Sequence, residues 1–276
     1  MDYYQYNFIV TPPEPGSDIL ISAIADSGFE SFELNEKGFL AYIPENLNDN
    51  LNLDEFVFDD FKFTFSSQKI VQVNWNEEWE KNFMPVIVSD QCCIRAPFHT
   101  LDKKYLYEII IMPKMSFGTG HHDTTWLMCK NMLDVDFKNK TVFDMGCGTG
   151  ILSILSKKLG AATVIGNDID EWSVENSLEN CANNGYSDIE IIQGNGNIFS
   201  NKSQFDIILA NINKNVIKAH LSALSEIIKP NGKLFLSGFF KTDCEELIHL
   251  ASNNSFNLIK QEHKNDWATL LFERRI

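Results

Sequence analysis

The segment that most constrains this 276-residue chain is an apolar run ending in Asp144, which leads into a turn with three glycines. Gly146, Gly148 and Gly150 alternate with other residues, and residues 151–159 then have the pattern of a helix. A strand, a tight glycine turn and a helix start form the place where α/β proteins hold nucleotide-like ligands. The segment therefore predicts a Rossmann-like fold with a ligand at the carboxyl end of this strand.

The spacing of these glycines distinguishes between ligands. Dinucleotide-binding proteins have G-x-G-x-x-G, and phosphate loops add Gly-Lys-Ser/Thr, whereas this turn reads G-x-G-x-G and has neither feature. We expect two of the glycines to let the backbone turn and approach a ligand. The third should allow helix and strand to pack closely.

Two acids lie at the ends of neighbouring strands. Asp144 would repel a pyrophosphate, so it favours a ligand with an ammonium group, contacted directly or through water. Asp168 ends the next apolar strand, at about the separation where dinucleotide folds place the carboxylate that accepts from ribose hydroxyls. A glycine turn and a ribose acid without a phosphate grip fit S-adenosylmethionine. The alternative is a glycine turn with a purely structural role.

A second turn, Gly118-Thr119-Gly120, precedes an expected helix over residues 123–133. Backbone N–H groups and hydroxyls at a helix start suit the carboxylate end of an amino-acid-like ligand. His121 and His122 raise the alternative of a metal site. Adjacent histidines lack the i, i+4 spacing of a helical metal site, and no cysteine or acid cluster completes one, so polar contacts are favoured.

Two asparagines follow later strands of the expected sheet. Asn211 ends the fourth strand, where its amide oxygen can accept from an attacking amine and its NH₂ group can face the cofactor. The alternative is that Asn211 caps the next helix, as Asn213 or Asn215 also can. Asn195, after the third strand, is a candidate for contact with the adenine amino group.

From residue 140 onward, strand and helix patterns alternate, which predicts a doubly wound, mostly parallel sheet. The last two strands, 256–260 and 267–272, lie too close in sequence for a crossover helix, so they must pair antiparallel.

Residues 1–70 have the pattern of a small α+β domain. We expect a hairpin around residues 35–38, a helix capped by Ser17 or Asp18 after a proline-rich break, and strands at residues 56–58 and 61–65, the second of them half-buried. Three parts result: a small α+β domain at 1–70, a linker helix at 71–84 and a domain at 85–276 that would bind S-adenosylmethionine.

The net charge of −15 is concentrated in residues 1–70, which carry thirteen acids and three lysines, a net −10. This part would attract a basic protein and repel nucleic acid; the alternative is an ordinary solvated surface. The six cysteines show no regular spacing and no apolar run is long enough to span a membrane. These features, with a start unlike a signal peptide, predict a cytoplasmic protein with reduced thiols. We also expect a monomer.

Several motifs together resemble the PrmA family, bacterial methyltransferases of protein eleven of the large ribosomal subunit. They are Phe-Gly-Thr-Gly-His-His-Asp-Thr-Thr at residues 117–125, Asp-Met-Gly-Cys-Gly-Thr-Gly at 144–150, Asp-Ile-Asp at 168–170 and Ala-Asn-Ile at 210–212. The resemblance implies a class I S-adenosylmethionine-dependent fold. It also implies transfer of methyl groups to lysine ε-amino and N-terminal α-amino groups, with the front domain docking a basic ribosomal protein.

In the family, cofactor contacts fall at positions matching Thr125, Gly146, Asp168 and Asn211. We expect Asn211 to be catalytic and no metal to be bound. The expected cofactor contacts are Phe117, Gly118, Thr119, Gly120, Thr125, Asp144, Gly146, Gly148, Gly150, Asp168, Ile169, Asn195 and Asn211. Two alternatives remain: a methyltransferase for another protein or a small molecule, and a cofactor-binding interaction protein without turnover.

Overall fold

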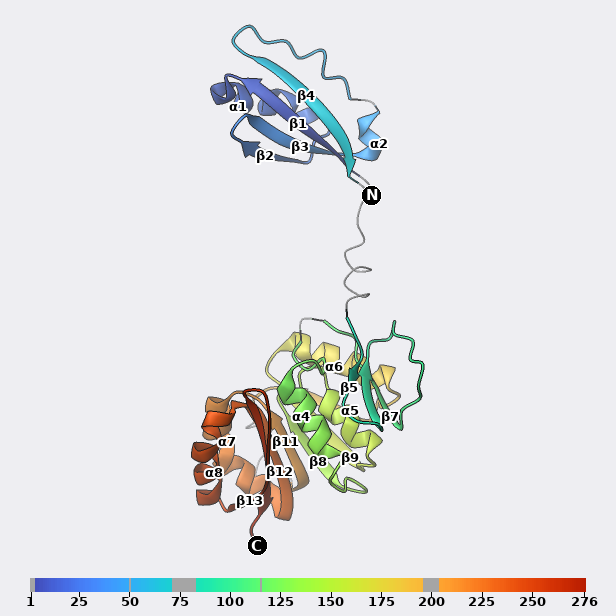
Figure 1. Cartoon of the computed structure of the whole chain (residues 1–276), viewed down its shortest axis with the longest axis vertical. Helices are drawn as coiled ribbons and strands as arrows, with labels where there is room; N and C mark the ends of the chain where they lie inside the picture. The colour runs from blue at the N-terminus through green and yellow to red at the C-terminus, as the bar shows by residue number, and fades with distance from the viewer. Residues whose placement is uncertain (1–2, 50, 71–82, 115, 196–203) are drawn as a thin grey trace. The chain divides into compact units, whose positions relative to one another are not determined.

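A computed structural model describes residues 3–49, 51–70, 83–114, 116–195 and 204–276. The chain divides into two compact units, Met1–Asn82 and Phe83–Ile276, shown in Figure 1. The expected linker helix at 71–84 lies outside the described residues, except for its last two positions. Each unit is described by itself.

The first unit contains four strands: β1 Tyr3–Thr11, β2 Ser31–Asn35, β3 Gly38–Pro44 and β4 Lys62–Ile70. They form an antiparallel sheet in the order β2-β3-β1-β4. The hairpin between β2 and β3, predicted from the glycine at residue 38, is confirmed. The helices are α1 Pro13–Ile24, the short 3₁₀ helix η1 Ala25–Ser27 and α2 Glu45–Asn48.

Two local predictions for this unit are wrong. Helix α1 begins at Pro13, before the predicted cap, and it has no side-chain cap. Ser17 lies buried inside the helix, because Gly16 packs closely on Val10 and Phe61 and draws this turn into the core. Residues 56–58 form no strand: Phe56 and Phe58 pack against the hydrophobic core from a loop, whereas Val57 is exposed.

Aromatic rings dominate the core of the first unit. Phe8 of β1 is fully buried and stacks on Phe39 of β3, with 4.7 Å between the ring centroids. Phe29 and Phe63 contact Phe8 from other sides. The burial of β1 alternates along the strand, so Ile9, the next residue, points to the opposite face and is 45% exposed. Period-two alternation thus places one face of β1 in the core.

The second unit contains a seven-stranded sheet made of β8 Thr141–Met145, β9 Thr163–Asp168, β10 Glu190–Gln193, β11 Phe205–Asn211, β12 Ile228–Phe240, β13 Phe256–Lys264 and β14 Trp267–Arg274. Their order is β10-β9-β8-β11-β12-β14-β13. The first five strands in this order are parallel, and β14 pairs antiparallel with both neighbours. This confirms the predicted doubly wound sheet with an antiparallel end.

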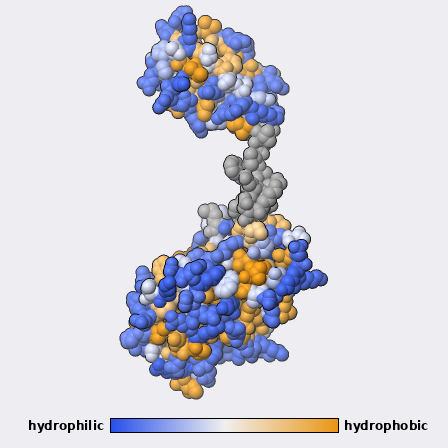
Figure 2. Space-filling model, in the orientation of Figure 1, coloured by the Kyte–Doolittle hydropathy of each residue, from blue (hydrophilic) through white to orange (hydrophobic). Residues whose placement is uncertain are grey.

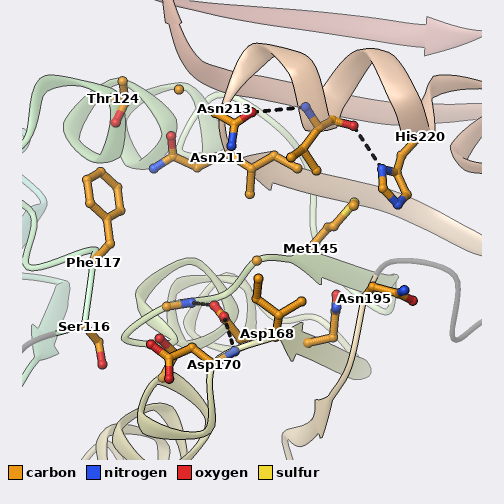
Figure 3. A pocket seen from close by; sticks show the side chains of 18 of the residues that line it. Ser116, Phe117, Thr124, Met145, Asp168, Asp170, Asn195, Asn211, Asn213 and His220 are labelled. Atoms are coloured by element: carbon orange, nitrogen blue, oxygen red, sulfur yellow. Dashed lines mark hydrogen bonds between the residues drawn. The ribbon is translucent and has the colours of Figure 1, made fainter.

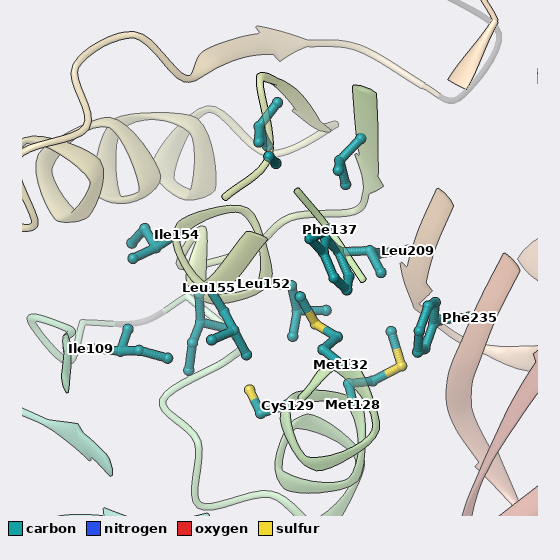
Figure 4. Packing of buried hydrophobic residues seen from close by; sticks show 14 of the residues in the cluster. Ile109, Met128, Cys129, Met132, Phe137, Leu152, Ile154, Leu155, Leu209 and Phe235 are labelled. Carbon is teal, nitrogen blue, oxygen red and sulfur yellow. The ribbon is translucent and has the colours of Figure 1, made fainter. Parts of the chain in front are cut away.

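Five α-helices cover this sheet: α4 Asp123–Met132, α5 Ile151–Lys158, α6 Glu171–Asn183, α7 Lys214–Ile227 and α8 Cys244–Asn253. Adjacent strand residues face opposite layers. Ile208 packs with the core beneath α7 and α8, whereas Leu209 packs with α4 and α5 on the other face. Figure 4 shows this second core, where Met128 and Met132 of α4 lie near Leu209.

A small three-stranded sheet precedes the glycine turns, formed by β5 Val86–Ile87, β6 Cys92–Arg95 and β7 Tyr107–Ile110. Cys92 and Cys93 are both fully buried in β6, and burial raises the pKa of Cys92 to about 12. All six cysteines are buried free thiols, so they act as packing groups.

The visible surface of both units is mostly hydrophilic, with hydrophobic residues scattered over it (Figure 2). None of the helices in the described ranges is long and apolar enough to cross a membrane.

Replacing Phe8 by alanine should destabilise the first unit by roughly 3–5 kcal/mol, because a buried ring is lost from the centre of the aromatic cluster. The matched control is Ile9→Ala on the exposed face of the same strand, which should cost about 1 kcal/mol or less. Hydrogen exchange of residues 3–70 in the full chain measures both effects. Equal protection in the two variants would contradict this account of the core.

Candidate active site

A cavity of about 580 Å³ opens where the parallel strands of the second unit end (Figure 3). Met145 ends β8, Asp168 ends β9 and Asn211 ends β11, and all three line it. Asn195 lines it from the loop after β10. The volume is in the range of sites that bind small molecules. The cavity therefore lies at the edge where the sequence predicts a ligand.

Hydrogen bonds join the two glycine-containing turns. The Thr149 N–H donates to the Phe117 carbonyl oxygen over 2.9 Å, and the Thr149 hydroxyl donates to the Gly118 carbonyl oxygen over 2.7 Å. Gly148 has a φ of +54°, and a Cβ there would lie 2.3 Å from the Phe117 carbonyl oxygen. Residue 148 must be a glycine, because the backbone of the turn at residues 117–120 comes too close to it for a side chain to fit. Phe117 is held at the cavity by this contact.

Gly150, the third glycine of the motif at residues 144–150, also lies in close contact with another element. Gly150, with a φ of +78°, packs against Ser177 of α6, so the close helix packing expected for the third glycine is made with α6 rather than with the strand. Gly118, Thr119, Gly120 and Gly150 do not line the cavity. Gly146 and Gly148 do line it.

Asp168 joins the glycine turn to the cavity. One carboxylate oxygen, Oδ2, accepts from the Gly148 N–H over 2.9 Å, and the other, Oδ1, accepts from the Asp170 N–H over 3.1 Å. The side chain is half-buried and lines the cavity beside the exposed Ile169. Each carboxylate oxygen can accept more than one hydrogen bond, so the orientation set by the turn leaves capacity for ligand hydroxyls.

Asp144 lies behind the glycine turn and does not line the cavity. It is only 1% exposed; Oδ2 accepts from the Ser153 hydroxyl over 2.7 Å, whereas Oδ1 has no hydrogen-bond partner. Burial raises the pKa of Asp144 to about 7, and the hydrogen bond from Ser153 opposes this shift. A buried carboxyl with a free oxygen is a group that a cation close to the turn would ionise.

Asn211 lines the cavity, and one atom of its side-chain amide has no hydrogen-bond partner. Its Nδ2 donates to the Thr125 hydroxyl over 3.3 Å, and its Oδ1 is buried without a partner. Thr125 itself is fully buried and does not line the cavity, although its neighbour Thr124 does. Asn213, not Asn211, caps α7, since its Oδ1 accepts from the Val216 N–H over 3.1 Å. Asn211 is therefore available for a ligand.

The two histidines after the first glycine turn make polar contacts. His121 donates from Nε2 to the Met84 carbonyl oxygen over 2.9 Å, and Nδ1 of His122 accepts from the Thr124 N–H as the cap of α4. Within the residues that the structure describes, no group of three or more His, Cys, Asp or Glu side chains is arranged to hold a metal ion.

Several cavity residues were missed by sequence reasoning. Trp267 begins β14 and pairs with Phe240 of β12, with their rings stacked at 4.4 Å. His122 packs edge-on against Trp267 at 4.6 Å and contacts Phe117 at 5.2 Å. An antiparallel strand begins at the edge where parallel strands end, so the predicted topology could have placed Trp267 here. The remaining missed lining residues are Ser116, Thr124, Met145, Asn167, Asp170, Ser173, Ile212, Asn213, Val216, His220 and Gly238.

The charge of the cavity disfavours phosphate ligands. Among the described residues that line it, Asp168 and Asp170 are carboxylates and none is lysine or arginine. S-Adenosylmethionine carries ammonium and sulfonium charges, ribose hydroxyls and no phosphate. The acidic lining and the orphaned oxygens of Asn211 and Asp144 fit such a group.

The raised pKa of Asp144 predicts how stability changes with pH. The folded pKa of about 7 lies above its ordinary value of 3.8, so its contribution to stability is complete below about pH 4 and is lost as pH rises to about 7. Between about pH 5.5 and 7, the wild type should lose roughly 2 kcal/mol relative to Asp144→Asn. Urea unfolding of both proteins measures this difference, and parallel pH profiles would contradict it.

Comparison with known proteins identifies the family. Residues 28–275 match the family described as ribosomal protein L11 methyltransferase (PrmA). A ribosomal protein L11 methyltransferase of Porphyromonas gingivalis is 41% identical over 283 residues, covering 99% of this chain and 98% of that protein. One from Bacteroides thetaiotaomicron is 38% identical, with 99% of each chain covered.

A solved structure agrees with the fold. The crystal structure of a ribosomal protein L11 methylase from Lactobacillus delbrueckii subsp. bulgaricus aligns with a TM-score of 0.65 at 26% identity, covering 70% of this chain and 100% of that one. The fold is that of class I methyltransferases, and the methyl donor is S-adenosylmethionine. The chain belongs to the ribosomal protein L11 methyltransferase (PrmA) family.

Proposed function

We propose that this enzyme transfers methyl groups from S-adenosylmethionine to lysine ε-amino and N-terminal α-amino groups of ribosomal protein L11. The relatives are named for methylation of this protein. The observation that supports an amine acceptor is the buried Oδ1 of Asn211, which has no partner and belongs to a residue that lines the cavity.

Asn211 would position the incoming amine. The Asn211 NH₂ group donates to the Thr125 hydroxyl, which orients the amide and leaves its buried Oδ1 as an acceptor without a partner. An N–H of a neutral amine can donate to this oxygen, and the nitrogen lone pair then points elsewhere, toward the methyl group. S-Adenosylmethionine supplies that methyl group on a positively charged sulfur. Positioning of this kind can account for much of a rate enhancement.

The aromatic rings at the cavity would exclude water from the reacting groups. Phe117, His122 and Trp267 form a contiguous row of rings in the wall. A protonated lysine has an ordinary pKa of about 10.4, and a desolvated site beside a positive charge favours the neutral amine that the reaction requires. No general base is assigned, because desolvation and the cofactor's positive charge lower the pKa of the amine and so favour its neutral form.

Asp168 would hold the cofactor's ribose hydroxyls with the accepting capacity that remains after its bonds to Gly148 and Asp170. Residues 1–70 would dock the protein substrate. Their net charge of −10 suits a basic partner, and their fold has its own hydrophobic core.

Asp168→Ala should weaken binding of S-adenosylhomocysteine by roughly 100-fold, since hydrogen bonds to a charged acceptor are lost. Asp168→Asn is the matched variant: its amide oxygen still accepts from the Gly148 N–H, so it should lose only about tenfold. Calorimetry measures both affinities. Unchanged binding in Asp168→Ala would refute the ribose assignment.

Asn211→Ala should reduce kcat by roughly 100-fold and cofactor affinity by less than about threefold, because the lost oxygen faces the amine. Asn213→Ala is the control, since it removes the α7 cap but no proposed contact to the amine. Single-turnover kinetics with L11 and calorimetry with the cofactor separate the two effects. Equal losses of turnover and affinity would make Asn211 a cofactor residue only.

Removal of residues 1–70 should leave cofactor binding within about twofold, because residues 83–276 contain their own two hydrophobic cores. Methyl transfer to L11 should fall by at least roughly 100-fold as docking is lost. Transfer of radiolabelled methyl groups, with calorimetry as the folding control, tests this. Retained activity on L11 would refute the docking role, and retained activity on a small amine alone would favour a small-molecule methyltransferase.

A further inference from the structure

The cavity has two distinct ends, seen in Figure 3. Phe117, Thr124 and Asn211 lie at one end, and Asn195 and His220 lie at the other. Met145 lies between these groups near the second end. A ligand that fills the cavity must therefore present different chemistry to each end.

The inference rests on the proposed function, which places the methyl group beside Asn211 and the ribose beside Asp168. In S-adenosylmethionine the sulfur is attached through C5′ to C4′ of the ribose and the base to C1′, the two carbons that flank the ring oxygen. With the ribose at Asp168 and the sulfur directed toward Asn211, the adenine base extends toward the end of the cavity that Asn195 and His220 line.

The tautomer of His220 follows from its contact within α7. Nδ1 lies 2.9 Å from the Val216 carbonyl oxygen, one helical turn earlier. A carbonyl oxygen only accepts hydrogen bonds, so Nδ1 carries the hydrogen and Nε2 of the neutral ring is an acceptor. Figure 3 shows this second nitrogen directed toward the interior of the cavity.

The surroundings of His220 are suited to a base. Met145 is almost fully buried, and Ile212 and Val216 add apolar surface at the cavity. Asn195 carries an amide, which has both a donor and an acceptor. His220 offers only an acceptor, so it distinguishes a 6-amino from a 6-oxo purine.

We propose that His220 is the residue that selects adenine, with Nε2 accepting a hydrogen bond from the exocyclic 6-amino group of the base. A 6-oxo purine would place an oxygen lone pair against the lone pair of Nε2, which leaves both groups without a donor. His220 is a specificity-determining residue for the cofactor, positioned by the Val216 carbonyl oxygen rather than by the glycine turn.

The test measures the affinity of S-adenosylhomocysteine and S-inosylhomocysteine by calorimetry. The wild type should bind the inosyl compound at least roughly 20-fold more weakly. His220→Ala should bind the adenosyl compound about tenfold more weakly and reduce this ratio at least about fivefold. His220→Gln should restore adenosyl binding while improving inosyl binding, because its amide offers either an acceptor or a donor.

His249→Ala, an exposed histidine on α8, is the matched control and should leave both affinities unchanged. A ratio that stays the same in His220→Ala would overturn the proposal, as would a wild type that does not discriminate. Loss of the ratio in Asn195→Ala but not in His220→Ala would assign selection to Asn195 instead. Unchanged adenosyl affinity in Asp168→Ala would refute the ribose placement alone, and a collapsed ratio in His220→Ala would still assign adenine selection to His220.

Discussion

The site depends first on the junction between two turns that are about thirty residues apart in sequence. Thr149 binds the Phe117 and Gly118 carbonyl oxygens, and Gly148 allows the backbones to meet without a side chain between them. The same turn donates the Gly148 N–H to Asp168. One turn therefore orients a cavity wall on one side and a carboxylate on the other. Because these contacts use backbone groups, they tolerate little displacement of either turn.

In the second unit, the hydrophobic core and the polar groups of the cavity occupy different parts of the sheet. Its two hydrophobic layers bury alternate residues of β11 and β12, and this holds the strand ends in register. Polar groups lie just beyond those ends, where the apolar run of each strand stops. The orphaned oxygen of Asn211 is tolerable there because a ligand can satisfy it. The cavity and its polar groups thus lie at one edge of a sheet whose faces are covered by hydrophobic core.

The fold of this unit could be predicted from its sequence because strands and helices alternate and have distinct periods. The antiparallel end followed from a connection too short for a helix. Local signals also pointed to Asp168 and Asn211, which both line the cavity. They could not show that Gly148 faces Phe117, or that Asp144 has its pKa raised by burial, because both depend on packing between distant segments. His220 carried no motif, and its role depends on which side of α7 faces the cavity. The start of α1 was missed because core packing of Gly16 overrode the capping signal at Ser17.

Strand β14 is made after β13 but is inserted between β13 and β12. β13 therefore reaches the rest of the described sheet through β14. Trp267, the first residue of β14, also contributes its ring to the aromatic wall of the cavity. Docking of this hairpin on β12 therefore completes the sheet and the cavity wall together.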